Sequence, residues 1–124
     1  MLLTSRSILY PEAQLGLEHE FLAEMRERLV KTFLDMLILL RLRKHPMSGD
    51  DVINSTAYRF SFTIDPGMIY STLHHLEKKG FIKSPETPKG QVYHLTADGR
   101  DRINIFLESK AKILGLVLDL FIGQ

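Results

Sequence analysis

Apolar residues recur every three or four positions through the first third of the chain, which is the spacing of helices. From Pro11 to about Arg28 this spacing predicts an amphipathic helix whose other face is acidic. From Leu29 to Lys44 apolar residues cover more than half of the helical circumference, so this stretch is expected to be the central core helix. The helix should end near His45, because Pro46 disfavours helical geometry at the residue before it.

A short helix is expected next, from about Gly49 to Tyr58, because Ser48 can cap its first free amides. It is small and should pack on the core helix. Its predicted inward positions are Val52, Ile53 and Ala57.

The most clearly bounded helix of the sequence runs from Asp65 to Ile82. Asp65 can cap the first amides, Pro66 suits the first helical position, and Gly80 can adopt the left-handed conformation that ends a helix. These signals predict a helix with fixed ends.

The two faces of this helix differ in character. Helical spacing brings Ile69, Leu73 and Leu76 to one side, which should be buried. The remaining positions carry small, polar or aromatic residues: Gly67, Ser71, His74 and Lys78, with Tyr70 and His75 on the shoulders. The polar face is either an ordinary solvated surface or a surface that touches a partner.

Alternation of apolar and polar residues predicts extended structure in two places. The RFSFTI stretch is expected to form a brief extended segment. FIKSPE and VYHLT flank a Pro and Gly turn, which predicts a β-hairpin whose tip is polar and basic. At or near the tip are Lys89, Gly90 and Gln91.

A last helix is predicted from Ala97 to about Ile122, with Thr96 as its cap. Its end, ILGLVLDLFIG, is too apolar for the exposed terminal helix of a monomer, and a second copy of the chain is the simplest cover. Packing within its own domain is the alternative. The predicted interface comprises Phe106, Ile113, Leu114, Val117, Leu118 and Phe121.

The composition indicates one modest core. The chain has 124 residues, 44% of them hydrophobic, a net charge of +1 and no cysteine. We therefore expect a single folded unit with a tail and acidic helix (1–28), a central domain (29–96) and a dimerisation helix (97–124). No stretch resembles a signal peptide or a bilayer span, so a soluble, cytoplasmic, nucleoid-associated protein is expected, without contact to a membrane.

No pattern of residues indicates an enzyme, a metal site or a cofactor. His19 and Glu20 begin a zinc-protease motif, but Ala23 stands where the second histidine is needed. The adjacent His74 and His75 diverge around a helix and cannot clasp one metal ion. Glycine-rich phosphate loops and nucleophile elbows are missing from the sequence.

Helix, helix, capped helix and basic hairpin follow one another in the order of a winged helix-turn-helix. The predicted fold is therefore mainly α with a small β-hairpin, plus N-terminal and C-terminal dimerisation helices. In such a fold the capped helix enters the major groove of double-stranded DNA and the hairpin reaches the backbone. The candidate DNA-binding residues are Pro66, Gly67, Tyr70, Ser71, His74, His75, Lys78, Lys83, Lys89 and Gln91.

Three motifs resemble those of PadR-like winged-helix transcriptional regulators. They lie in ILLRLRKHPMSGDDVI, DPGMIYSTLHHLEKKGFI and VYHLTADGRDRI, between about Val30 and Ile103. The matching positions are Pro46, Met47 and Gly49; Pro66, Gly67, Ile69, Tyr70, Leu73, Leu76, Glu77, Gly80, Phe81 and Ile82; and Tyr93, Leu95, Thr96 and Gly99.

The resemblance implies a dimeric DNA-binding regulator, often a repressor, that would bind a palindromic operator. Three positions depart from the family pattern: Asp50 replaces a usual tyrosine, His75 a frequent arginine, and the wing has only Lys89 where arginines are common. A winged-helix module that binds proteins rather than DNA is the alternative. A small-molecule effector and a role of the N-terminal helix in the dimer stay open.

Overall fold

The computed structural model describes residues 11–123, and side chains from residue 15 onward. The expected N-terminal tail, residues 1–10, lies outside this range. The chain forms two compact units, Met1–Phe33 and Leu34–Gln124.

The described part of the first unit is helix α2, Pro11–Thr32. Its apolar side chains at Leu17, Phe21 and Leu22 are 44–56% exposed, so the predicted apolar face has no cover within this unit. The predicted helix break near residue 28 is wrong: the turn lies at Phe33, and α3 begins at Leu34. Apolar residues continue across this turn without a Gly or Pro, so the sequence pattern does not predict the turn.

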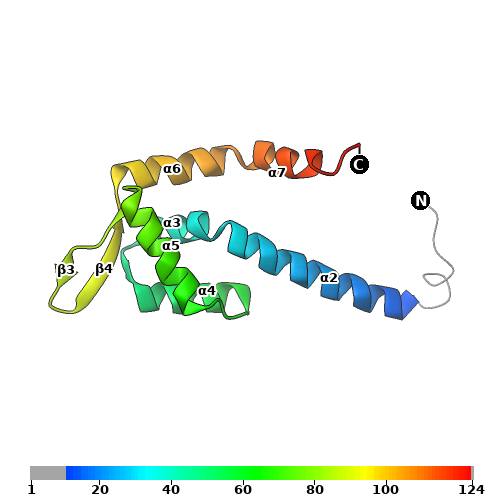
Figure 1. Cartoon of the computed structure of the whole chain (residues 1–124), viewed down its shortest axis with the longest axis horizontal. Coiled ribbons are helices and arrows are strands. Elements are labelled where there is room, and N and C mark those ends of the chain that lie inside the picture. The colour runs from blue at the N-terminus through cyan, green and yellow to red at the C-terminus, as the bar shows by residue number, and fades with distance from the viewer. Residues whose placement is uncertain (1–10, 124) are drawn as a thin grey trace. The chain divides into compact units, whose positions relative to one another are not determined.

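Three helices build the core of the second unit: α3 (Leu34–Lys44), α4 (Gly49–Phe60) and α5 (Pro66–Lys78). α3 packs against α5, and α5 against α4, while α6 (Ala97–Glu108) covers α3 (Figure 1). The fully buried side chains come from these four helices and, at Ile82, from the strand β2 (Ile82–Lys83) that follows α5: Leu34, Ile38, Leu39, Val52, Ile69, Leu73, Leu76, Ile82 and Ile103. The expectation of a central core helix is confirmed for α3.

The start of α4 is confirmed and its end differs from the prediction. Ser48 accepts a hydrogen bond from the Asp51 amide, and the Asp51 side chain accepts one from the Ser48 amide. The prediction of an extended segment at RFSFTI is wrong, because α4 continues to Phe60. Ser61 ends the helix with a φ of 61°. Among the predicted inward residues Val52 is fully buried, whereas Ile53 and Ala57 are half-buried.

The hairpin is confirmed, with a more elaborate sheet than predicted. β2 (Ile82–Lys83) and β3 (Glu86–Thr87) pair in succession with β4 (Gly90–Leu95), and β3 and β4 project beyond the helices (Figure 1). A further strand, β1 (Met47–Ser48), pairs with β4 and brings Met47 opposite Tyr93. Two residues are too few to show an alternating pattern, so β1 was not expected.

The prediction of a single C-terminal helix is wrong. This part of the chain forms two helices, α6 and α7 (Lys110–Asp119), which meet at Ser109. Thr96 caps α6 as predicted, by accepting a hydrogen bond from the Gly99 amide. Its hydroxyl also donates to the Gly80 carbonyl at 2.6 Å. The start of α6 is thereby tied to the end of α5.

Candidate DNA interface

The ends of α5 are formed by the three residues that the sequence assigns to them. The Asp65 side chain accepts a hydrogen bond from the Gly67 amide at 3.1 Å, and Pro66 is the first helical residue. Gly80 has a φ of 83°, the left-handed conformation that stops the helix. The helix therefore starts and ends at fixed points on the core.

The two faces of α5 separate as expected. Ile69, Leu73 and Leu76 are at most 1% exposed, and they anchor the helix to the core. Away from the core the helix exposes a polar surface: Pro66, Gly67, Ser71, His74 and Lys78. The exposed groups include hydroxyl, imidazole and ammonium donors, which suit phosphates and base edges.

Tyr70 is exposed on α5, but its ring and hydroxyl are held in place. The hydroxyl donates a hydrogen bond to Asp50 Oδ1 at 3.1 Å, and this bond raises the pKa of Tyr70 above its ordinary value, with a smaller contribution from burial. The ring lies directly on Gly49, where an added Cβ would come within 2.5 Å of Tyr70 Cε1. A larger residue at position 49 would therefore displace the ring from this position.

His75 lies four residues after Ser71, so the two residues share a side of α5. It lines a hollow of about 180 Å³ together with residues of α3 and α6, among them Asp35 and Arg102. Its imidazole is exposed and borders this hollow.

The predicted wing residues lie on the hairpin and are all exposed. Lys83 is in β2, Gln91 is in β4, and Lys89 is in the turn between β3 and β4. The sequence places the tip of the hairpin correctly.

A chain of hydrogen bonds ties the wing to α5. Gln91 Nε2 donates to Ser84 Oγ at 2.8 Å, and the Ser84 hydroxyl donates to a carboxylate oxygen of Glu77. Burial and the negative charge of Glu77 raise the pKa of Tyr93, a residue of β4. Sequence reasoning missed Glu77 and Ser84, because their proximity arises only when the chain reverses after Gly80.

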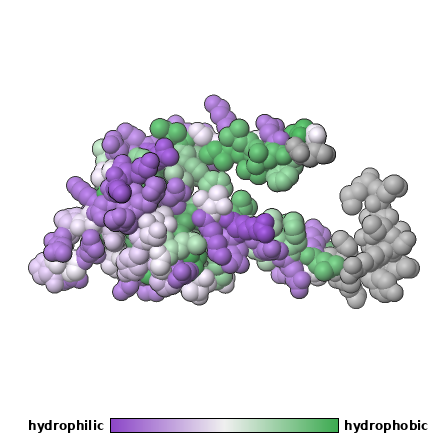
Figure 2. Space-filling view, in the orientation of Figure 1, coloured by the Kyte–Doolittle hydropathy of each residue, from purple (hydrophilic) through white to green (hydrophobic). Residues whose placement is uncertain are grey.

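The predicted dimer surface is unevenly exposed. Phe106, Ile113 and Val117 are half-buried, whereas Leu114, Leu118 and Phe121 are 58–74% exposed. Hydrophobic side chains make up much of the visible surface of α7 (Figure 2), and no residue of α7 is buried. Ile105, Leu116, Leu120 and Ile122, which lie outside the predicted interface, are also exposed apolar residues.

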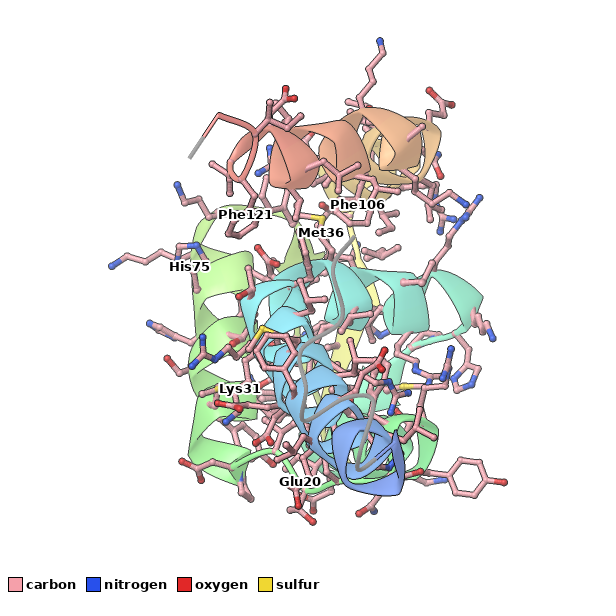
Figure 3. All side chains as sticks on the ribbon, turned by 90° about the vertical axis from the view of Figure 1, so that its right-hand side faces the viewer. Glu20, Lys31, Met36, His75, Phe106 and Phe121 are labelled. Carbon is pink, nitrogen blue, oxygen red and sulfur yellow. The ribbon has the colours of Figure 1, made fainter. Side chains whose placement is uncertain are left out.

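An apolar hollow of about 200 Å³ adjoins this surface. Met36 of α3 and Phe106 of α6 point toward one another across it (Figure 3), and Ile105 and Ile113 complete its apolar wall. The apolar surface of α7 therefore continues inward toward the core.

Two other kinds of site were sought in residues 11–123. No three histidine, aspartate or glutamate side chains converge there as metal ligands. None of the helices in that range combines the length and the apolar character that crossing a bilayer requires.

A capped helix packed across two others and followed by a hairpin wing defines a winged helix-turn-helix protein. Residues 38–105 match the sequence pattern of the Transcriptional regulator PadR-like family. The chain belongs to this family, and it is a transcriptional regulator rather than an enzyme. The resemblance predicted from the three motifs is thus confirmed.

Solved structures of transcriptional regulators share this fold. A PadR family regulator from Eggerthella lenta is 19% identical, with 88% of this chain and 99% of that chain covered and a TM-score of 0.65. A regulator from Clostridium thermocellum is 21% identical over 77% of this chain and 95% of that chain, also with a TM-score of 0.65. A putative regulator from Thermoplasma acidophilum is 28% identical over 77% and 97%, with a TM-score of 0.58. No curated protein sequence matches the chain significantly.

Proposed function

We propose that the chain is a homodimeric repressor that binds a palindromic operator in double-stranded DNA. The observation that carries this proposal is the exposed polar face of α5, held by Ile69, Leu73 and Leu76 and flanked by a wing tied to the same helix. Such a helix is suited to the major groove, where its first turns face base edges.

The exposed residues divide by chemistry into two groups. The lysine ammonium groups of Lys78, Lys83 and Lys89 suit phosphates, which give affinity without sequence preference. Ser71 and His74 can donate to base edges, and Pro66 and Gly67 allow close approach of the helix start. Tyr70, His75 and Gln91 complete the proposed surface, although each has a neighbour within the protein.

The proposed dimer is formed by the apolar surface of α6 and α7. With only three lysines on α5 and the wing, one copy would bind DNA weakly, and two linked copies multiply the affinity. The two α5 helices of a symmetric dimer would face two half-sites of a palindrome.

Binding to the DNA upstream of the chain's own gene tests this proposal. The affinity should fall linearly with salt on logarithmic axes, with a slope of roughly −5 if three lysines of each copy neutralise phosphates. Fluorescence anisotropy with labelled duplexes at several salt concentrations measures this slope. Failure to bind any upstream duplex, or binding that salt does not change, contradicts the proposal.

Single substitutions separate the two proposed groups of contacts. Ser71→Ala and His74→Ala should bring the affinities for operator and unrelated duplex closer together, by about tenfold each. Lys89→Ala should weaken binding to both duplexes alike and make the salt slope of the dimer shallower by about two, because each copy loses one lysine. The reverse pattern would refute this assignment of roles.

A protein-binding module is the second candidate function. It is favoured by the net charge of only +1 and by the exposed apolar side chains of α2. A stable protein complex that survives nuclease treatment, together with absent duplex binding, would select it.

A further inference from the structure

The contact between Asp50 and Tyr70 joins two helices at an exposed position. Asp50 lies in the first turn of α4, Tyr70 in the second turn of α5, and Tyr70 is 44% exposed. Their hydrogen bond of 3.1 Å connects residues that are 20 positions apart in the sequence. Both polar groups remain open to a molecule that approaches α5.

The position of the tyrosine hydroxyl is fixed from two directions. Gly49 supplies a bare backbone surface under the ring, with no room even for a methyl group. Asp50 fixes the direction of the hydroxyl through the hydrogen bond. A group that is already held in place loses little conformational entropy when it binds, so it discriminates well between ligands.

The hydrogen-bonding capacity of this pair is one-sided. A phenol has one proton, and here it is donated to Asp50, so the Tyr70 oxygen retains only lone pairs. The second carboxylate oxygen of Asp50 is also an acceptor. The ion pairs found among the described residues, Arg28–Glu24 and Lys31–Glu27, involve neither residue. The pair is therefore an anionic acceptor, which disfavours phosphate.

We propose that Asp50 and Tyr70 together read an exocyclic amino group, that of cytosine or adenine, in the major groove. This inference rests on the proposed function, because it requires α5 to lie in the groove. The amino groups of cytosine and adenine are the hydrogen-bond donors that the major groove presents. The N–H that points into the groove would donate to the Tyr70 oxygen, whose own proton goes to Asp50, and such a chain of bonds is mutually strengthening.

Selection from a randomised duplex library tests the inference with the full chain. The wild type should enrich one base pair at a single position of each half-site, because the place of the amino group in the major groove differs between the four base-pair orientations. Tyr70→Phe, which keeps the ring on Gly49, and Asp50→Ala should reduce that enrichment about tenfold. Tyr58→Phe is the matched control, because Tyr58 is a 91% exposed tyrosine on α4 and should leave the selected sequence unchanged.

Base analogues identify which amino group is read. In the selected duplex, 2-pyrimidinone replaces cytosine or unsubstituted purine replaces adenine, so that only the amino group is removed. The affinity of the wild type should fall about tenfold when one of the two analogues replaces the natural base. The affinity of Tyr70→Phe should be the same for the natural duplex and for that analogue.

The outcomes distinguish this inference from the proposed function. If Tyr70→Phe and Asp50→Ala select the same sequence as the wild type with equal strength, the pair merely joins α4 to α5 and the inference is overturned. A wild-type affinity that neither base analogue lowers overturns it as well. A wild-type chain that binds no duplex overturns the proposed function together with it.

Discussion

The double variant Leu114→Glu and Leu118→Glu is expected to be monomeric and to bind operator DNA at least about a hundredfold more weakly than the wild type. These leucines are 60% and 58% exposed and lie four residues apart, on one side of α7. Charges are tolerated there in a single copy, since both positions face water. In a dimer they would place carboxylates in the apolar contact, where burying a charge is costly.

Sedimentation velocity and duplex titration measure the two effects in the same preparations. Lys110→Glu is the matched control, because it adds an acidic group to an exposed position of the same helix. It should leave the dimer intact. A double variant that stays dimeric would contradict the proposed role of α7, and a monomer of unchanged affinity would contradict the need for two copies.

Gly99→Ala is expected to lower the free energy of unfolding by about 3 kcal/mol, a severe loss for one methyl group. A Cβ at this position would come within 1.9 Å of the Phe81 carbonyl oxygen. This carbonyl cannot move freely, because it accepts a hydrogen bond from the Thr96 amide at 3.1 Å. Relief of the clash would have to displace the start of α6 from β2.

Urea unfolding followed by circular dichroism measures the loss. Gly67→Ala in α5 is the control, because its added Cβ would lie 3.5 Å from a carboxylate oxygen of Asp65, which is an ordinary contact. It should change the stability by less than about 1 kcal/mol. Equal unfolding midpoints for Gly99→Ala and the wild type would show that the approach of α6 to Phe81 is looser than described.

Two glycines of the family motifs acquire a physical reason from the structure. Gly99 allows α6 to approach the Phe81 backbone, and Gly49 allows the Tyr70 ring to lie against the start of α4. Both needs involve residues distant in sequence, so no local pattern predicts them. The motif positions mark where separate elements touch.

Local signals predicted the boundaries that depend on neighbouring residues. The caps at Ser48, Asp65 and Thr96 are all present, because a capping side chain bonds to amides two or three residues further along. The buried stripe of α5 was predictable for the same reason, since helical spacing alone determines it.

Features that depend on distant residues were missed. The turn at Phe33 and the break at Ser109 interrupt continuous helical patterns, and β1 exists only because β4 lies beside it. In the candidate DNA interface, too, only the features that depend on neighbouring residues were predictable. Exposure of Ser71 and His74 follows from periodicity, whereas the partners of Tyr70 and Gln91 come from elements that the fold brings together.

The central claim is that two copies of α5 lie in the major groove of one duplex, and methylation interference tests it most directly. Methylation of guanine N7 blocks the major groove, and methylation of adenine N3 blocks the minor groove. The account predicts N7 interference in two symmetric half-sites about one helical turn, roughly 10 base pairs, apart. Interference confined to adenine N3, or to a single unrepeated site, would contradict it.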